Sequence, residues 1–270
     1  MVVQHNLSAM NTNRQMGVVT SALQKSTEKL SSGYKINRAG DDAAGLSISE
    51  KMRSQIRGLN KASDNAQDGI SLIQVAEGAL NETHSILQRM NELATQAAND
   101  TNTSVDRQSI KDEIEQLNEE LDRISTTTQF NKQDLLTGGF SGKLQVGALE
   151  GQTMDVKISL AVSAKGLKVS AVEVSTNAKA GTAMKSIQDA IESVSKQRSK
   201  LGAIQNRLEH TINNLDTNAE NTQAAESRIR DTDMADEMVQ YSKNNILSQA
   251  GQSMLAQANQ QTQGVLSLLG

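Results

Sequence analysis

Apolar residues recur at helical spacing along much of the first half of the chain. From Ile56, steps of three and four residues alternate as far as Ala94, and eight of the twelve positions reached are apolar. This heptad pattern predicts one continuous helix from about Leu46 to Ala98, which would be roughly 75 Å long at about 1.5 Å per residue. The four polar positions in the pattern are Ser63, Glu77, His84 and Asn91.

Two further segments repeat this spacing. After the polar sequence NDTNTS, apolar residues step by four and three from Ile110 to Ile124. In the C-terminal half, nine of thirteen positions with the same spacing between Ile187 and Ile229 are apolar. Three helices with such apolar stripes can pack against one another as a bundle. The sequence therefore predicts a mainly α fold, a long antiparallel helical bundle or coiled-coil rod.

The period changes between these helical segments. Residues 138–161 contain several glycines and alternate between apolar and polar positions, as do residues 166–175. Such alternation is typical of short strands. We expect one or two β-hairpins here, at the tip of the rod.

The two ends of the chain carry almost no charge. Residues 1–24 contain a single charged side chain, Arg14, and residues 244–270 contain none. Solvated helices normally carry charge on their outer face, so these ends are better suited to burial against partner helices. The alternative is a pair of frayed tails without a function. The residues expected to mediate assembly are Leu7, Met16, Leu23, Leu30, Leu247, Met254, Leu255, Val265 and Leu268.

The composition narrows the functional classes. The chain has no Pro, Cys or Trp, and only two Tyr and two Phe. Any core must be aliphatic, and disulfides and thiol chemistry are excluded. With a net charge of −4, the chain has no excess of basic residues of the kind that favours nucleic-acid binding. The N-terminus lacks a signal-peptide pattern, and no run of 18 apolar residues would cross a membrane. If the protein leaves the cell, we expect an export route that does not depend on a cleavable signal peptide.

Adjacent carboxylates at Asp41 and Asp42 could form an acid–base pair or a metal site. No nucleophile or basic partner has the spacing that would make the pair catalytic. We interpret them as the start of a helix, with Ser47 and Glu50 as an S-x-x-E capping box. Gly45, together with the preceding glycine, is expected to allow a bend between the terminal helix and the long one.

The second acidic cluster, residues 231–238, contains four acids in eight residues. It could bind calcium, but it lacks the ligand spacing of an EF-hand loop. A helix start capped by Asp231 or Asp233 is the better interpretation. The three histidines lie far apart in the sequence, and none of the motifs GxxxxGK(S/T), GxGxxG, HExxH and GxSxG is present. We therefore expect no catalytic residue, no metal site and no cofactor.

Several stretches together resemble bacterial flagellin, in a short form without large variable outer domains. The likeness covers about residues 1–136 and 180–270. The motifs that carry it are LSSGYKINRAGDDAAGLSISEKMRSQIRGLNKASDNAQDGISLIQVAEGALNE (30–82), LQRMNELATQAAND (87–100), DEIEQLNEELDRIS (112–125), TQFNKQDLL (128–136), LGAIQNRLEHTINNL (201–215), ESRIRDTDMADEM (226–238) and MLAQANQQTQGVLSLLG (254–270).

The resemblance implies four parts. Residues 1–36 and 237–270 would pair as an inner coiled-coil assembly domain, and residues 37–46 and 226–236 would form a linking region. A helical rod would comprise residues 47–136 and 180–225, with a β-hairpin tip at residues 137–179. Copies of such a chain would stack helically into an extracellular flagellar filament used for motility.

The resemblance also implies partners. They are other copies of the chain, a flagellar export chaperone of the type III apparatus, cap and hook-junction proteins, and Toll-like receptor 5 of animal hosts, with no nucleic acid and no membrane among them. The receptor motif maps to Gln88, Arg89, Leu93, Gln96 and Glu113. Arg89, Leu93 and Gln96 step by four and three, so one helix face is expected to present them. The sequence departs from the family motif at Met90 and Asn91.

The function expected is that of a structural subunit that self-assembles and catalyses nothing. One alternative is a coiled-coil signalling hairpin of the chemoreceptor type, which the long heptads would fit but the uncharged ends would not. A hook–filament junction protein is a second alternative. A secreted helical protein that binds membranes is a third, but it would need basic residues beside the lipid face, and residues 244–270 have none.

Overall fold

The computed structural model describes the backbone of residues 6–269 and the side chains as far as Gln261. Within that part of the chain five helices dominate, so the predicted mainly α fold is confirmed. The chain divides into two compact units, which we call the terminal unit (Met1–Ser54 and Asn221–Gly270) and the central unit (Gln55–Glu220). The helices are α1 (Leu7–Ser32), α2 (Ala43–Ala97), α3 (Ser104–Thr127), α4 (Asn177–Arg230) and α5 (Met234–Leu269).

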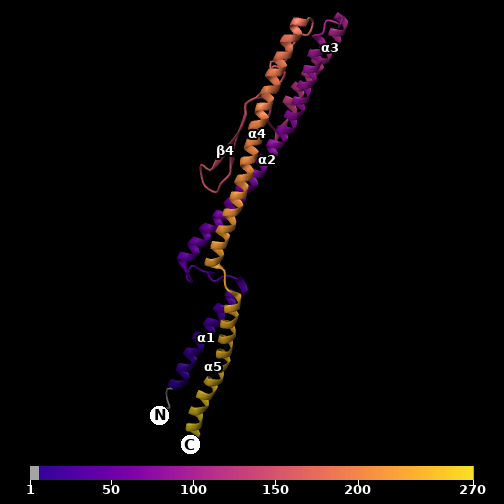
Figure 1. Ribbon diagram of the computed structural model, residues 1–270. Helices are drawn as coiled ribbons and strands as arrows, with labels where there is room; N and C mark the ends of the chain where they lie inside the picture. Colours follow the sequence, from indigo (N-terminus) through magenta and orange to yellow (C-terminus); the bar gives the residue numbers. More distant parts are fainter. Residues whose placement is uncertain (1–5, 270) are drawn as a thin grey trace. The chain divides into compact units, whose positions relative to one another are not determined.

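The core of the central unit lies between α2, α3 and α4, which run side by side there (Figure 1). Their directions follow from pairs of contacts. Ser63 of α2 donates to Asp216 of α4 at 3.0 Å, and Asn177 at the start of α4 donates to the carbonyl oxygen of Ala98, so α2 and α4 are antiparallel. The core is aliphatic, as the composition predicts, with Leu80, Leu87, Leu121 and Leu201 fully buried.

The buried stripe of α2 corrects the predicted seam. Ala66, Ile73, Leu80, Leu87 and Ala94 are buried as expected. Of the alternate positions, Ser63 is buried as expected, but Glu77, His84 and Asn91 are only half-buried, because the buried row lies one residue earlier than predicted. The residues of this buried row are Ala62, Gly69, Ala76, Thr83, Met90 and Ala97, one every seven residues.

Two antiparallel hairpins complete the central unit. In the first, β1 (Gln129–Phe130) pairs with β2 (Gln133–Asp134). In the second, β3 (Phe140–Gln145) pairs with β4 (Thr153–Ile158), and Met154, Val156 and Ile158 turn inward.

The β3–β4 hairpin lies along the flank of the helices and not at their end (Figure 1). Asn65 of α2 donates to the carbonyl oxygen of Gln145, and Gln197 of α4 donates to that of Lys157. A Cβ atom on Gly69 would lie 2.3 Å from a methyl carbon of Leu144, so the absence of a side chain on α2 makes room for the hairpin. The hairpin is part of the core, which explains why it is not at a tip.

In the terminal unit α1 and α5 pair antiparallel. Asn6 donates to the carbonyl oxygen of Ala258 at one end of the pair, and Lys29 meets Glu237 at the other. The α1 helix ends at Gly33, whose φ of 75° is left-handed and whose N–H donates to the carbonyl oxygen of Lys29. Among the described residues, no helix is long and apolar enough to cross a membrane.

Candidate assembly surface and polar junction

The face of α1 that packs on α5 has a regular heptad spacing. The two helices pack directly against each other. On α1, Met16, Leu23 and Leu30 are half-buried along this seam, with Ser26 buried between them. These three apolar residues were among those predicted to mediate assembly, and they face the partner helix within the same chain.

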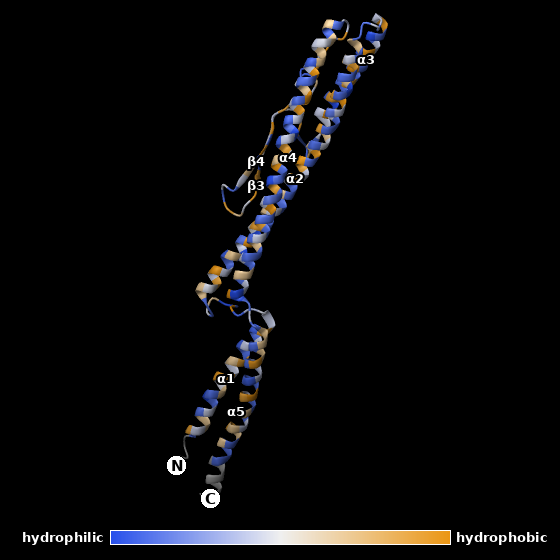
Figure 2. Ribbon diagram, viewed as in Figure 1, coloured by the Kyte–Doolittle hydropathy of each residue, from blue (hydrophilic) through white to orange (hydrophobic). Residues whose placement is uncertain are grey.

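The α5 helix presents mostly polar and small residues to that seam. Its inward positions follow heptad spacing and are half-buried or buried: Glu237, Tyr241, Asn244, Ser248, Gly251, Leu255 and Ala258. By contrast, several of its large apolar side chains face solvent, and Figure 2 shows apolar residues along both helices. The exposed large apolar residues of α5 are Met234, Met238, Val239, Ile246, Leu247 and Met254.

The α1 helix has a matching outward set. Leu7, Met10 and Val18 are each more than 60% exposed. At about 100° per residue, these three lie within a quarter of the helix circumference. We call the outward apolar residues of α1 and α5 the outward surface: Leu7, Met10, Val18, Val239, Ile246, Leu247 and Met254.

The outward surface contains Leu7, Leu247 and Met254 from the predicted assembly set, whereas Leu255 lies in the seam. The side chains of Val265 and Leu268, also in that set, lie outside the described residues. A helix pair with few charges that leaves its large apolar side chains in solvent is suited to bury them against further helices.

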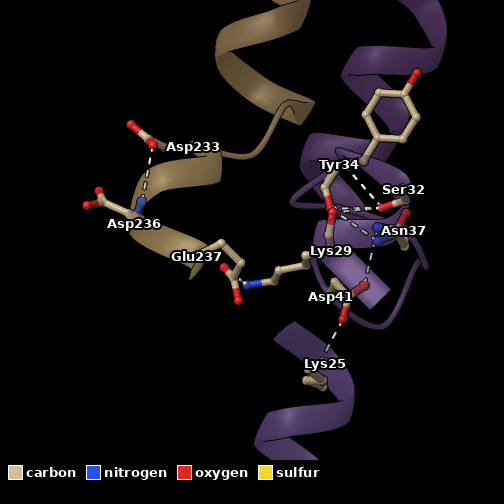
Figure 3. Close-up of polar contacts among 9 residues, drawn as sticks. All are labelled: Lys25, Lys29, Ser32, Tyr34, Asn37, Asp41, Asp233, Asp236 and Glu237. Atoms are coloured by element: carbon tan, nitrogen blue, oxygen red, sulfur yellow. Dashed lines mark hydrogen bonds and ion pairs between the residues drawn. The ribbon is translucent and has the colours of Figure 1, made fainter. Parts of the chain in front are cut away.

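A polar junction joins α1, the segment after it, and the start of α5 (Figure 3). The N–H of Lys35 donates to the carbonyl oxygen of Arg230 at 2.7 Å, and the N–H of Thr232 donates to that of Gly33 at 2.9 Å. Tyr34 and Asp231 thus form an isolated antiparallel bridge. The end of α1 is tied through its backbone to the segment between α4 and α5.

Ion pairs reinforce this junction. Lys25 lies 3.5 Å from Asp41, and Lys29 lies 3.4 Å from Glu237 (Figure 3). The Asp41 carboxylate also accepts from the N–H groups of Arg38 and Asn37, and these backbone donors, Arg38 first, lower the pKa of Asp41. Asp41 therefore acts as a structural acceptor that orders the turn.

Arg230 connects more of this unit than any sequence pattern indicated. Its guanidinium lies 4.7 Å from the ring centroid of Tyr34 and donates to Glu50 at 2.8 Å. This hydrogen bond lowers the pKa of Glu50. Ser49, which is buried, donates to Glu226 at 2.8 Å beside them. The Arg230–Glu50 and Ser49–Glu226 contacts join residues about 180 positions apart, so the spacing of nearby residues could not predict them.

The predicted capping box is wrong. The α2 helix begins at Ala43, and Asp42 caps it by accepting from the N–H of Gly45 at 2.9 Å. Ser47 and Glu50 therefore lie inside the helix. Gly45 is not a bend but a close contact, because a Cβ atom there would lie 2.4 Å from the Asp42 carboxylate.

The second acidic cluster starts a helix, as the capping interpretation predicts. Asp233 accepts from the N–H groups of Ala235 and Asp236 at 2.9 and 3.2 Å (Figure 3). Among the described residues, no three His, Asp or Glu side chains are grouped where they could hold a metal ion.

The predicted receptor motif is only partly presented on the surface. Arg89 of α2 donates to Glu113 of α3 at 2.9 and 3.0 Å and to Glu92 at 3.2 Å, and its hydrogen bond to Glu113 raises its pKa. Gln88 and Gln96 are exposed, but Leu93 is only 2% exposed and packs in the core. The expectation that one face presents Arg89, Leu93 and Gln96 together is therefore wrong for Leu93.

Two family models match the chain. The model described as the bacterial flagellin N-terminal helical region matches residues 3–141, and the model described as the bacterial flagellin C-terminal helical region matches residues 184–269. Together these ranges include all five helices, apart from the first residues of α4.

Curated proteins and a solved structure agree with this match. The chain is 56% identical over 271 residues to a flagellin of Halalkalibacterium halodurans and 52% identical over 305 residues to a flagellin of Bacillus subtilis. Both alignments cover 100% of each chain. The crystal structure of Bacillus cereus flagellin is 34% identical, with a TM-score of 0.51, and the match covers 60% of this chain and 94% of that chain.

Proposed function

The chain belongs to the bacterial flagellin family and is a structural subunit of the flagellar filament rather than an enzyme, and from this premise we propose that the outward surface of its α1–α5 pair is what copies of the chain bury against one another. The observation that carries the proposal is the distribution of polar and apolar side chains on α5, which is the reverse of that expected for an isolated helix pair. Its seam with α1 is mostly polar and small, whereas Ile246, Leu247 and Met254 face solvent. Burial of each such side chain contributes about 1.5–3 kcal/mol.

The absence of charge supports the same proposal. The last 27 residues of the chain contain no charged side chain, and α1 carries only Arg14 in its first two-thirds. Burial of an unpaired charge would oppose association, whereas amide and hydroxyl side chains can hydrogen-bond across helices. Within residues 7–24 and 244–261, Arg14 is the single ionised side chain whose desolvation would oppose burial of this surface.

Seeded polymerisation of the full chain tests the proposal. Ile246→Asp adds a charge to the outward surface and is expected to abolish elongation on filament seeds, with the central unit still folded by circular dichroism. Val105→Asp is the matched control, because Val105 of the central unit is also an exposed apolar residue. If Ile246→Asp elongates as fast as Val105→Asp, the outward surface is not the assembly surface.

We also propose that the subunit is secreted through the flagellar type III apparatus with an export chaperone, and that cap and hook-junction proteins contact it during assembly outside the cell. Family membership supports these partners, and so does the uncharged C-terminal helix that a chaperone would cover. Co-purification of the chain with the cognate export chaperone, with and without residues 244–270, tests this step. Equal binding by both forms would contradict it.

The exposed polar residues around Arg89 support our proposal of a contact with Toll-like receptor 5. Arg89, Glu113 and the exposed Gln88 and Gln96 come together on α2 and α3, whereas Leu93 is available only if the core opens. Arg89→Ala is expected to weaken receptor activation by the free subunit, while Arg123→Ala, which removes another exposed Arg paired with a Glu, has little effect. Equal activation by both variants would contradict the contact.

A further inference from the structure

The methionines of this chain are distributed unevenly between buried and exposed positions. Among the described side chains, the exposed methionines are Met10, Met234, Met238 and Met254, and all four lie in the terminal unit. Met90 is fully buried in the core of the central unit, and Met154 is also buried there. Because the chain has no Cys and no Trp, thioethers are its most readily oxidised side chains.

Two of these methionines lie at the same level of the α1–α5 pair. Asn6 donates to the carbonyl oxygen of Ala258, and a Cβ atom on Gly251 would lie 3.8 Å from the Met16 side chain, so the antiparallel register brings Met10 level with Met254. Their side chains are 64% and 61% exposed. Both belong to the outward surface, whereas Met234 and Met238 are separate from it, near the start of α5.

We propose that Met10 and Met254 form an oxidation site that controls assembly: a peroxide converts their thioethers to sulfoxides in the free subunit, and the oxidised subunit no longer joins a filament. The inference rests on the proposed assembly role of the outward surface. In the reaction the thioether sulfur attacks a peroxide oxygen, the O–O bond breaks and an S–O bond forms. With hydrogen peroxide the sulfur loses two electrons, and the departing hydroxide takes up the proton of the transferred hydroxyl group and leaves as water.

The effect follows from the polarity of the product. A sulfoxide is a strong hydrogen-bond acceptor, and its burial without a donor costs free energy that a thioether does not. The seven side chains of the outward surface are apolar and carry no hydrogen-bond donor, and the charged donor nearest to them along α1 is Arg14, one turn from Met10. In a filament the same two sulfur atoms are covered by neighbouring copies, so the polymer is protected and the free subunit is sensitive.

Peptide mass spectrometry and seeded polymerisation test the inference on the full chain. After hydrogen peroxide treatment of the free subunit, Met10 and Met254 are expected to be oxidised well before Met90, and elongation is expected to fall at least about tenfold. Methionine sulfoxide reductase is expected to restore elongation. Oxidised subunits that elongate at the untreated rate would overturn the inference.

Two matched variants assign the effect to the site. M10L/M254L keeps volume and apolarity and is expected to elongate normally and to resist peroxide. M234L/M238L also removes two exposed thioethers, but it is expected to stay as sensitive as the original chain. The inference is wrong if M10L/M254L loses elongation after peroxide as the original chain does.

Treatment of assembled filaments separates this inference from the proposed function. Met10 and Met254 that oxidise as fast in filaments as in free subunits would overturn the burial of the outward surface itself. Protection in filaments together with normal elongation of oxidised subunits would overturn the oxidation control alone. Protection in filaments and failed elongation of oxidised subunits is the result expected.

Discussion

The guanidinium of Arg230, at the end of α4, donates to the carboxylate of Glu50 in α2 at 2.8 Å while lying over the ring of Tyr34. The side chain of Arg230 is only 12% exposed. One residue thus links the end of α4, the early part of α2 and the segment after α1. The backbone bridge between Tyr34 and Asp231 lies directly beside it.

Removal of this cation should loosen the polar junction. Arg230→Met keeps an apolar stem but loses the Glu50 hydrogen bond and the contact with Tyr34, so we expect the terminal unit to lose about 1 kcal/mol of stability. Hydrogen exchange at the N–H groups of Lys35 and Thr232 should quicken. Arg228→Met, at an exposed position two residues earlier, should leave both rates unchanged. Equal rates in the two variants would contradict the role of Arg230.

The junction should weaken in acid. Arg230 lowers the pKa of Glu50 from its ordinary value of 4.5, and the N–H of Arg38 lowers that of Asp41 from 3.8. The unfolded chain therefore takes up protons at higher pH than the folded one. The stabilisation is fully present above these ordinary values and is lost as the pH falls through them toward the lowered values.

Thermal unfolding of the terminal unit between pH 7 and pH 3 checks this sign. We expect its midpoint temperature to fall with acidification, and to fall less in the Glu50→Gln/Asp41→Asn variant, which has no such protons to bind. A variant as acid-sensitive as the original chain would show that other groups are responsible.

The buried stripe of α2 predicts sharply different effects at adjacent positions. Ala76 is fully buried, whereas Val75 is 41% exposed. Ala76→Asp places a carboxylate in the core and should lower the free energy of unfolding of the central unit by about 3 kcal/mol or more. Val75→Asp should change it by less than about 1 kcal/mol. Denaturant unfolding measures both, and comparable losses would contradict the register described here.

The turn between β1 and β2 offers a stabilising substitution. Asn131 and Lys132 have φ values of 49° and 63°, so both central residues of this two-residue hairpin are left-handed. Asn suits the first position, and Gly is the usual residue at the second. Lys132→Gly should raise stability by about 0.5 kcal/mol because it relieves strain that Lys carries there. Lys132→Ala should not, and an equal gain from Ala would refute the explanation.

Most of the fold could be predicted from the sequence because large apolar residues recur at heptad spacing. Ile73, Leu80 and Leu87 were placed correctly in the α2 seam for this reason. The positions between them were missed because most of the residues that pack there are small. Ala76 and Gly69 contribute little to a hydrophobic pattern, yet their small size lets other elements approach closely.

The terminal helices show a different limit of sequence analysis. The heptad of Met16, Leu23 and Leu30 correctly marks the inner seam of α1, but the similar spacing of Leu247 and Met254 marks an outward face of α5. A seven-residue period does not say which partner a face contacts. Contacts such as Ser49 with Glu226 join residues far apart in the chain, and no local pattern encodes them.

The most direct test of the account is a structure of the assembled filament by electron cryo-microscopy with helical reconstruction. The quantity to measure is the solvent exposure of the outward surface, whose members are Leu7, Met10, Val18, Val239, Ile246, Leu247 and Met254. We predict that these side chains, exposed in the single chain, are buried against neighbouring copies. A filament in which they remain exposed to solvent, with copies joined through the central unit alone, would contradict the account.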